Sequence, residues 1–325
     1  MNKGVVLFLA ALAALAGCSS ESGTGGSGGT AGAGGDAGSG GMGGSGGDAR
    51  ACAAGIDVGE VQVFGDPTPL LRSEGLTFDA DGRLYVSAQD PGDELEPDQL
   101  IEVMLDGSND EVASAPSILG LESDPRGILG AGIGTENLLL LDPADGSSEE
   151  IATGLGEPNF VVTTPWGTIL VSDDRPGEGS ILEVTWEGDV TMWSAEVPTP
   201  NGMVFSLDGG TLYVAATFEE AGLWRIPVSS EGVAGTAEKW VPFDSSAPDG
   251  IAIDSEGNVY VALNTAGQIA KVDPEGNSSM LATGMTGPAS LAFGQGDFDP
   301  CSLYVTSLFT QNLYRVGAGV LGVEK

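Results

Sequence analysis

The sequence predicts an all-β fold: a six-bladed β-propeller whose four-stranded blades surround a central channel. The apolar runs in residues 51–325 are short, rich in Val, Ile, Leu and Tyr, and separated by turn dipeptides such as Asp-Gly and Glu-Gly. No long segment keeps the 3.6-residue apolar period of an amphipathic helix. One phrase recurs every 40 to 48 residues, which is the period of a four-stranded propeller blade.

The repeated phrase is clearest at residues 200–215. There a polar residue follows a proline, a short apolar strand leads to a tight turn at Asp208-Gly209, and a second strand follows. Equivalent positions of successive blades surround one axis, so the first polar position of every phrase is expected at the same end of the channel. The copy in the second blade matches least well. In chain order these six positions are Glu74, Ser117, Asn159, Asn201, Asp249 and Ala289.

Residues 1–17 have the features of an export signal. Lys3 gives a positive start, and the apolar run at residues 5–15 is too short to span a bilayer. The run ends in Leu-Ala-Gly-Cys18, which resembles a bacterial lipobox and implies that Cys18 is acylated and becomes the mature N-terminus. The alternative is an ordinary secretory peptide with a chance cysteine. Ser19 follows the cysteine, and by resemblance to Gram-negative lipoproteins this implies an outer-membrane anchor that faces the periplasm or the cell surface.

Residues 18–50 are expected to form a tether. After Cys18 they are mostly Gly, Ser, Ala and Thr, so they cannot bury enough apolar surface to offset the entropy of ordering. A Gly-rich coil of this length has a root-mean-square span of roughly 30 Å. The propeller, residues 51–325, would therefore contact the membrane only through its lipid anchor.

The composition excludes several classes of function. The chain carries 11 Lys and Arg against 47 Asp and Glu, a formal net charge of −36, and no histidine. Binding to nucleic acid through its phosphates needs a basic surface, which this chain lacks. Without histidine, the commonest general base and the Ser-His and Cys-His nucleophile pairs are excluded as well. The acidity is also explained by adaptation to salt or export.

Cysteine count predicts one disulfide. If Cys18 carries lipid, Cys52 and Cys301 remain, and two cysteines in an oxidising compartment tend to pair. Cys52 opens the folded part and Cys301 lies in its last blade, so the bond would fasten the ring where it closes. Two unpaired buried thiols are the alternative.

Four of the six repeated positions carry carboxylate or amide oxygens: Glu74, Asn159, Asn201 and Asp249. Such oxygens converging on one axis suit a hard cation, and Ca²⁺ binds six to eight of them. Zinc or copper would instead prefer His or Cys ligands. The alternative is that each is a turn residue bonded to its local backbone.

A resemblance to the regucalcin/gluconolactonase family of six-bladed propellers is carried by three phrases: Ser73-Glu74-Gly75, Asn201-Gly202-Met203 and Pro248-Asp249-Gly250. It extends over residues 61–316. The resemblance implies a divalent metal, most simply Ca²⁺, held in the channel by Glu74, Asn201 and Asp249.

The resemblance also assigns substrate contacts. It implies that Asn159 binds substrate or completes the metal shell. Family lactonases carry an arginine two residues before that asparagine, whereas this chain has Glu157. An acidic residue there argues against an anionic sugar substrate. Ser117, at the same repeated position in the second blade, is a further candidate for substrate contact.

These residues predict a metal-dependent hydrolase of a small lactone or ester that works at the channel mouth. With no histidine, Asp249 is the candidate catalytic group, as base toward water or as nucleophile. Two alternatives stay open. One is a calcium-dependent phosphotriesterase-type hydrolase at the same metal, and the other is a non-enzymatic propeller that binds a partner and keeps a structural metal.

Overall fold

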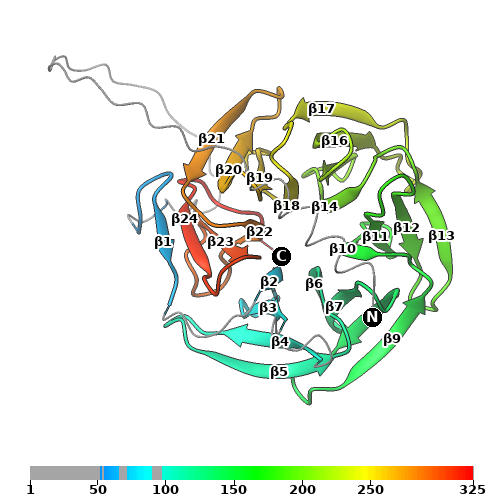
Figure 1. Cartoon of the computed structure of the whole chain (residues 1–325), viewed down its shortest axis with the longest axis horizontal. Helices are drawn as coiled ribbons and strands as arrows, with labels where there is room; N and C mark the ends of the chain where they lie inside the picture. The colour runs from blue at the N-terminus through cyan, green and yellow to red at the C-terminus, as the bar shows by residue number, and fades with distance from the viewer. Residues whose placement is uncertain (1–51, 53–54, 66–71, 90–96, 325) are drawn as a thin grey trace, which may run out of the picture.

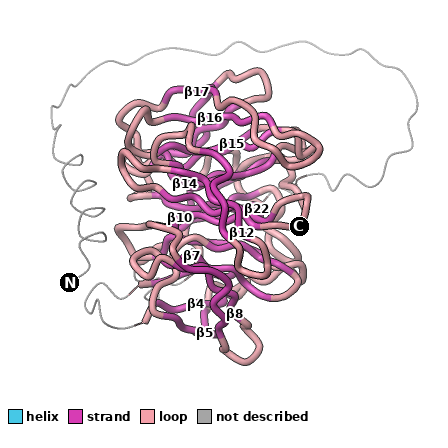
Figure 2. The backbone as a smooth tube through the Cα atoms, turned by 90° about the vertical axis from the view of Figure 1, so that its right-hand side faces the viewer, coloured by secondary structure: helices cyan, strands magenta, loops and turns pink. Residues whose placement is uncertain are grey.

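Six four-stranded antiparallel sheets surround a central channel (Figure 1). The computed structural model describes residues 52, 55–65, 72–89 and 97–324. Within these ranges every regular element is a strand, as the side view in Figure 2 also shows. The predicted six-bladed, all-β propeller is confirmed. The export signal, Cys18 and the tether lie outside the described residues.

In each blade one strand lies nearest the axis, and the other three follow outward (Figure 1). The innermost strands are β2 (Ser73–Phe78), β6 (Leu121–Asp124), β10 (Pro158–Thr163), β14 (Pro200–Phe205), β18 (Pro248–Ile253) and β22 (Pro288–Phe293). The second strands are β3 (Leu84–Ala88), β7 (Gly127–Gly132), β11 (Ile169–Asp173), β15 (Thr211–Ala216), β19 (Val259–Leu263) and β23 (Ser302–Ser307).

The two outer positions of the blades complete the sheets. The third strands are β4 (Asp98–Val103), β8 (Asn137–Leu141), β12 (Ser180–Val184), β16 (Gly222–Pro227), β20 (Gln268–Val272) and β24 (Tyr314–Gly317). The outermost strands are β5 (Asn109–Ala115), β9 (Ser148–Thr153), β13 (Val190–Ser194), β17 (Glu238–Pro242), β21 (Ser278–Thr283) and, in the last blade, β1 (Val61–Val63).

Apolar side chains between neighbouring blades form the core. Inner strands such as β18 are buried along their whole length because both faces of each sheet pack against other blades, whereas β13, at the rim, is exposed. At the junction of the first and last blades, Phe78, Phe298 and Tyr304 pack edge to face with ring centroids 5.2–5.7 Å apart. None of the described residues forms a helix long and apolar enough to cross a membrane.

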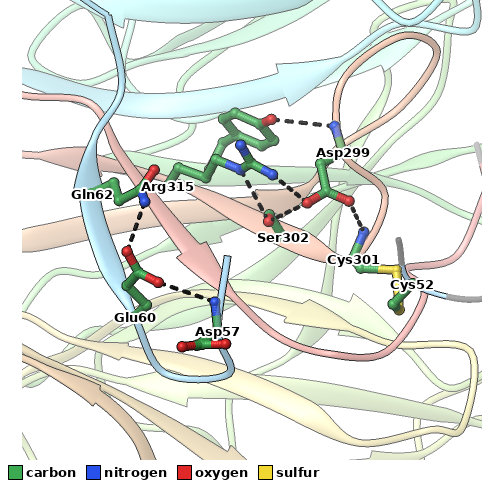
Figure 3. Close-up of polar contacts among 9 residues, drawn as sticks. Cys52, Asp57, Glu60, Gln62, Asp299, Cys301, Ser302 and Arg315 are labelled. Carbon is green, nitrogen blue, oxygen red and sulfur yellow. Dashed lines mark hydrogen bonds and ion pairs between the residues drawn. A yellow bond between two sulfur atoms is a disulfide. The ribbon is translucent and has the colours of Figure 1, made fainter. Parts of the chain in front are cut away.

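The ring closes where the two ends of the domain meet. Strand β1 pairs antiparallel with β24, so an N-terminal strand completes the blade of the C-terminal strands. Cys52 and Cys301 form the predicted disulfide, with Cα atoms 5.6 Å apart (Figure 3). The turn before Cys301 is held by Asp299, which accepts a hydrogen bond from the Cys301 amide and pairs with Arg315.

A glycine near the start of four inner strands sets the distance between blades. A Cβ atom at Gly75, Gly120, Gly202 or Gly250 would lie 2.0–2.8 Å from a backbone carbonyl oxygen of the next blade. No real side chain fits such a gap, so only glycine permits this approach. Those carbonyls belong to Leu119, Asn159, Asp249 and Ala289.

This contact corrects the expectation for the second blade. Gly75 meets the carbonyl of Leu119, as Gly202 meets that of Asp249. Leu119, and not Ser117, therefore occupies the repeated position in the second blade. In this blade Pro116 and Ser117 stand two residues before that position and Leu119 itself is apolar, so the sequence repeat predicts the wrong alignment here.

The side chains that line the channel differ between its two ends. The repeated polar positions lie where the inner strands begin. Toward the other ends of these strands, apolar side chains such as Phe78, Phe160 and Ile253 line a cavity of about 340 Å³, which Val323 of the C-terminal segment also lines. Glu122, Ser206 and Gln295 also line this cavity, but most of its lining residues are apolar.

Candidate metal centre

Glu74, Asn159, Asn201 and Asp249 each occupy the second position of an inner strand. All four side chains are at least 95% buried. Ala289 is the apolar equivalent in the last blade. The structure thus gathers the four predicted residues at one end of the channel.

The chain enters four of the six inner strands through a left-handed residue two positions before the repeated position. The φ angles are 48° at Arg72, 44° at Thr199, 46° at Ala247 and 57° at Gly287. A non-glycine residue there costs about 1 kcal/mol or more and persists only where the surroundings fix it. The carbonyl of Ala247 accepts a hydrogen bond from the amide of Asn264, and that of Thr199 accepts one from Thr217. This geometry places the end of each second strand beside the repeated position.

Three buried carboxylates influence one another at this end. Burial, followed by the charges of Asp249 and Asp174, raises the pKa of Glu74 well above its usual value. Burial raises the pKa of Asp249 to about 7, opposed by hydrogen bonds from Asn264 and Asn201. Burial likewise raises the pKa of Asp174 to about 8. Without a cation, the site therefore disfavours full ionisation.

Hydrogen bonds fix the orientation of the amides. The Nδ2 of Asn159 donates to Asp174 Oδ2 at 3.0 Å, and the Nδ2 of Asn201 donates to Thr217 Oγ1 at 3.1 Å. The Thr217 hydroxyl in turn donates to the carbonyl of Pro248 at 2.8 Å. Both amide nitrogens are therefore hydrogen-bonded, and the Asn201 oxygen has no part in these bonds.

Four buried side-chain atoms in the described part of the chain have no hydrogen-bond partner, and all four are oxygens of this end of the channel. They are Glu74 Oε1, Asp174 Oδ1, Asn201 Oδ1 and Asn264 Oδ1. An unpaired buried acceptor costs about 1–3 kcal/mol, and a cation would satisfy several acceptors together. The donor set fits Ca²⁺ or another hard divalent ion. Among the described residues no three acidic, His or Cys side chains are grouped closely enough to hold an ion by themselves, so amide oxygens would have to contribute.

The predicted substrate contacts lie around the third blade. The amide of Glu157 donates to Asp173, and the Glu157 carboxylate is close enough to Asp174 to raise the pKa of that group. Arg175 is the nearby cation, but its guanidinium is paired with Asp173 at 2.6 Å and Glu178 at 3.2 Å. The surroundings of Asn159 are therefore acidic.

Ser117 lies slightly apart. It hydrogen-bonds Asp98, whose pKa burial raises to about 6 and whose charge also acts on Glu74. Asp98 accepts a second bond from the amide of Ile118 at 2.7 Å. Ser117 thus supports the second-blade loop at the same end of the channel.

Sequence reasoning missed Asp174 and Asn264. Both stand 15 residues after a repeated position, Asn159 and Asp249 respectively, just past the end of the second strand. In an antiparallel hairpin that end lies beside the start of the first strand. This second repeated position could have been found by aligning the strand ends.

Comparison with known proteins finds relatives of this propeller. The sequence profile described as "SMP-30/Gluconolactonase/LRE-like region" matches residues 72–309. Pentonolactonase XacC of Haloferax volcanii is 30% identical over 173 residues, which cover 50% of this chain and 58% of that protein. A 6-deoxy-6-sulfogluconolactonase of Pseudomonas putida is 31% identical over 154 residues, 44% of this chain and 51% of that protein. The chain thus spans little more than half the length of these curated relatives.

Solved structures show the same architecture. A calcium-binding protein, regucalcin, from Agrobacterium tumefaciens superposes with a TM-score of 0.67 and 25% identity, covering 80% of this chain and 94% of that one. A Xanthomonas campestris gluconolactonase superposes with a TM-score of 0.66 at 19% identity, covering 79% of this chain and 89% of that one. The second likeness is one of fold alone.

Proposed function

The chain belongs to the SMP-30/gluconolactonase/LRE-like family, and on this basis we propose that it is a metal-dependent hydrolase of lactones or related esters. The observation that carries the proposal is the group of unpaired buried oxygens where the inner strands begin. Relatives named pentonolactonase and sulfogluconolactonase support the choice of a lactone as the reacting group.

Glu74, Asn201 and Asp249 would hold the cation, with Ca²⁺ the preferred ion for this oxygen set. When bound, a divalent cation supplies Lewis acidity to a carbonyl oxygen. Asp249 would accept a proton from the attacking water. Its pKa of about 7 without metal shows how strongly the site resists its charge, and hydrogen bonds from Asn264 and Asn201 hold its carboxylate in place.

The acidic third blade supports a substrate without negative charge. Asn159, oriented by Asp174, would contact the substrate, while the acidic Glu157 beside them would repel an anion. Arg175 does not offset them, because Asp173 and Glu178 already pair with its guanidinium. Neutral or cationic lactones are therefore the proposed substrate class.

A panel of neutral lactones, anionic lactones and aryl esters, assayed with calcium and with chelator, tests the function. Calcium-dependent turnover of a neutral lactone is expected, and Asp249→Asn should lower it about 100-fold or more. Asp208→Asn, at an exposed turn, is the control and should keep full activity. Lactone turnover that is unchanged by chelator, or that survives in Asp249→Asn, would contradict the proposal.

The same panel separates the alternatives. An oxygen-ligated cation polarises a phosphoryl oxygen as well as a carbonyl, so aryl phosphotriesters are included. Turnover of these alone would indicate a phosphotriesterase. Calcium binding with no turnover of any substrate would favour a non-enzymatic propeller with a structural metal.

We also propose that the enzyme is exported and anchored to the outer membrane through Cys18, with the Gly-rich segment as tether. The lipobox-like Leu-Ala-Gly-Cys18 supports this. Metabolic labelling with a fatty acid should mark the wild-type protein and not Cys18→Ser, which should appear in the soluble fraction. Equal labelling of both would exclude this anchor.

A further inference from the structure

Asn264 lies beside the proposed metal ligands, just past the end of β19, in a position to which the family resemblance assigns no role. Its side chain is 98% buried. The Nδ2 atom is 3.3 Å from Asp249 Oδ2 and 3.2 Å from the carbonyl oxygen of Pro288. Asn264 is therefore in direct contact with one predicted ligand of the cation.

The orientation of this amide is determined by its neighbours. Both groups near Nδ2 are acceptors, a carboxylate and a backbone carbonyl. A flipped amide would place its oxygen against both of them and lose two hydrogen bonds. The nitrogen must therefore occupy this place, and Oδ1 must point away from Pro288.

That oxygen is buried and has no partner. A buried carbonyl without a donor is unfavourable by about 1–3 kcal/mol. The unpaired oxygens of Asn201 and Glu74 belong to the same end of the channel. Asn201 and Asn264 thus each use the amide nitrogen on a neighbour and leave the amide oxygen unsatisfied.

We propose that Asn264 is an additional ligand of the cation, through Oδ1. Glu74 and Asp249 supply two negative charges, and Asn201 and Asn264 supply two neutral oxygens, a combination typical of Ca²⁺ sites. The shell then includes a residue that directly follows the second strand of a blade, as well as residues from three inner strands. This inference rests on the metal site of the proposed function.

Asn258 offers a matched control in the same blade. It is buried like Asn264, but it precedes β19, whereas Asn264 follows this strand. Its Nδ2 donates to Asp254 Oδ2 at 2.7 Å. Asn258→Leu therefore makes the same change of side chain at the opposite end of the strand from the predicted ligands.

The test is calcium titration calorimetry on chelator-stripped full-length protein, with thermal unfolding measured in chelator and in calcium. Wild type is measured first, and no binding would mean that the metal site itself is wrong. Asn264→Leu, of similar shape, is expected to weaken calcium binding about 10-fold or more. Asn258→Leu, at the far end of β19, should change it by no more than about threefold.

Asn264→Asp separates a ligand from a residue that only positions Asp249. This change removes the donor to Asp249 but keeps an oxygen and adds a charge. A ligand role predicts lower stability in chelator and calcium binding at least as tight as wild type. A positioning role predicts binding as weak as in Asn264→Leu, and this result would overturn the proposal. Binding by Asn264→Leu equal to wild type would overturn it too, and Asn264→Ser replaces that variant if it does not fold.

Discussion

At the scale of single residues, the site is defined by which atoms are left without partners. Asn201 and Asn264 use their amide nitrogens on neighbours and leave their oxygens free. Hydrogen bonding thus turns each amide so that its oxygen is available to a cation. Since buried polar groups are normally satisfied, the unpaired oxygens at one end of the channel support the proposed cation site.

The buried carboxylates predict an unusual pH dependence of stability. Asp249 and Asp174 have pKa values of about 7 and about 8 in the folded protein, above the ordinary value of 3.8. At pH values between the ordinary pKa and the raised pKa values, the folded state binds more protons than the unfolded state. The free energy of unfolding therefore falls as pH rises through this range. In chelator, the melting temperature should drop by roughly 5 °C or more from pH 5 to pH 8.

Calcium should reverse this trend, because the ion favours the ionised carboxylates and binds only the folded protein. Thermal unfolding across the same pH range, with excess calcium, should therefore show the largest stabilisation at high pH. A melting temperature that rises with pH in chelator would contradict the placement of these groups.

How far the residues of the site were predictable depends on their position in the repeat. Glu74, Asn201 and Asp249 could be found because each follows a serine or proline at the start of a repeated strand. Asp174 and Asn264 escaped because their role appears only when the hairpin places the end of its second strand beside the first. Which amide atom is engaged is a matter of packing, and no sequence pattern records it.

At the scale of elements, the glycines after the repeated positions connect blade packing to the site. A Cβ at Gly202 would lie 2.5 Å from the carbonyl oxygen of Asp249. The backbone that carries a proposed ligand therefore packs directly on this glycine. Small size at residue 202 is required for the position of Asp249.

Gly202→Ala should accordingly impair both stability and metal binding. The clash is with backbone, which has little freedom to move, so a loss of about 3 kcal/mol is expected, together with weaker calcium binding. Gly210→Ala in the same blade is the control, since its nearest neighbour is the flexible Asp208 side chain at 3.3 Å, and its effect should stay within about 0.5 kcal/mol. Chemical denaturation and calcium titration measure the two effects, and equal behaviour of the two variants would refute the packing argument.

The elements themselves were largely predictable. Spacing and turn dipeptides predicted six blades because each blade repeats the same hairpin chemistry. The second blade was misaligned because Leu119 and Gly120 keep the backbone packing of the repeat without its polar residue. Sequence patterns follow side-chain chemistry, whereas this contact depends on the backbone.

At the scale of the whole molecule, the seam between the first and last blades holds one of the proposed ligands. The hydroxyl of Thr306, in the last blade, donates to the backbone carbonyl of Glu74 in the first at 2.6 Å. The same blade is completed by β1 and fastened by Cys52–Cys301, whose sequence separation is 249 residues. The contacts that close the ring therefore also hold the backbone of Glu74 in position.

Removing the disulfide should weaken the fold and the metal site together. The variant Cys52→Ser with Cys301→Ser is expected to lose about 3–5 kcal/mol, because the bond restricts a long loop in the unfolded chain. A looser seam should also lower calcium affinity. Because coupling between two equilibria is reciprocal, calcium should shift the equilibrium of the wild-type disulfide in a thiol buffer toward the oxidised form. Thiol titration with and without calcium measures the second effect, and denaturation of the double variant measures the first. Equal reduced fractions at equilibrium in calcium and in chelator, combined with unchanged affinity in the double variant, would show that the seam and the metal site are independent.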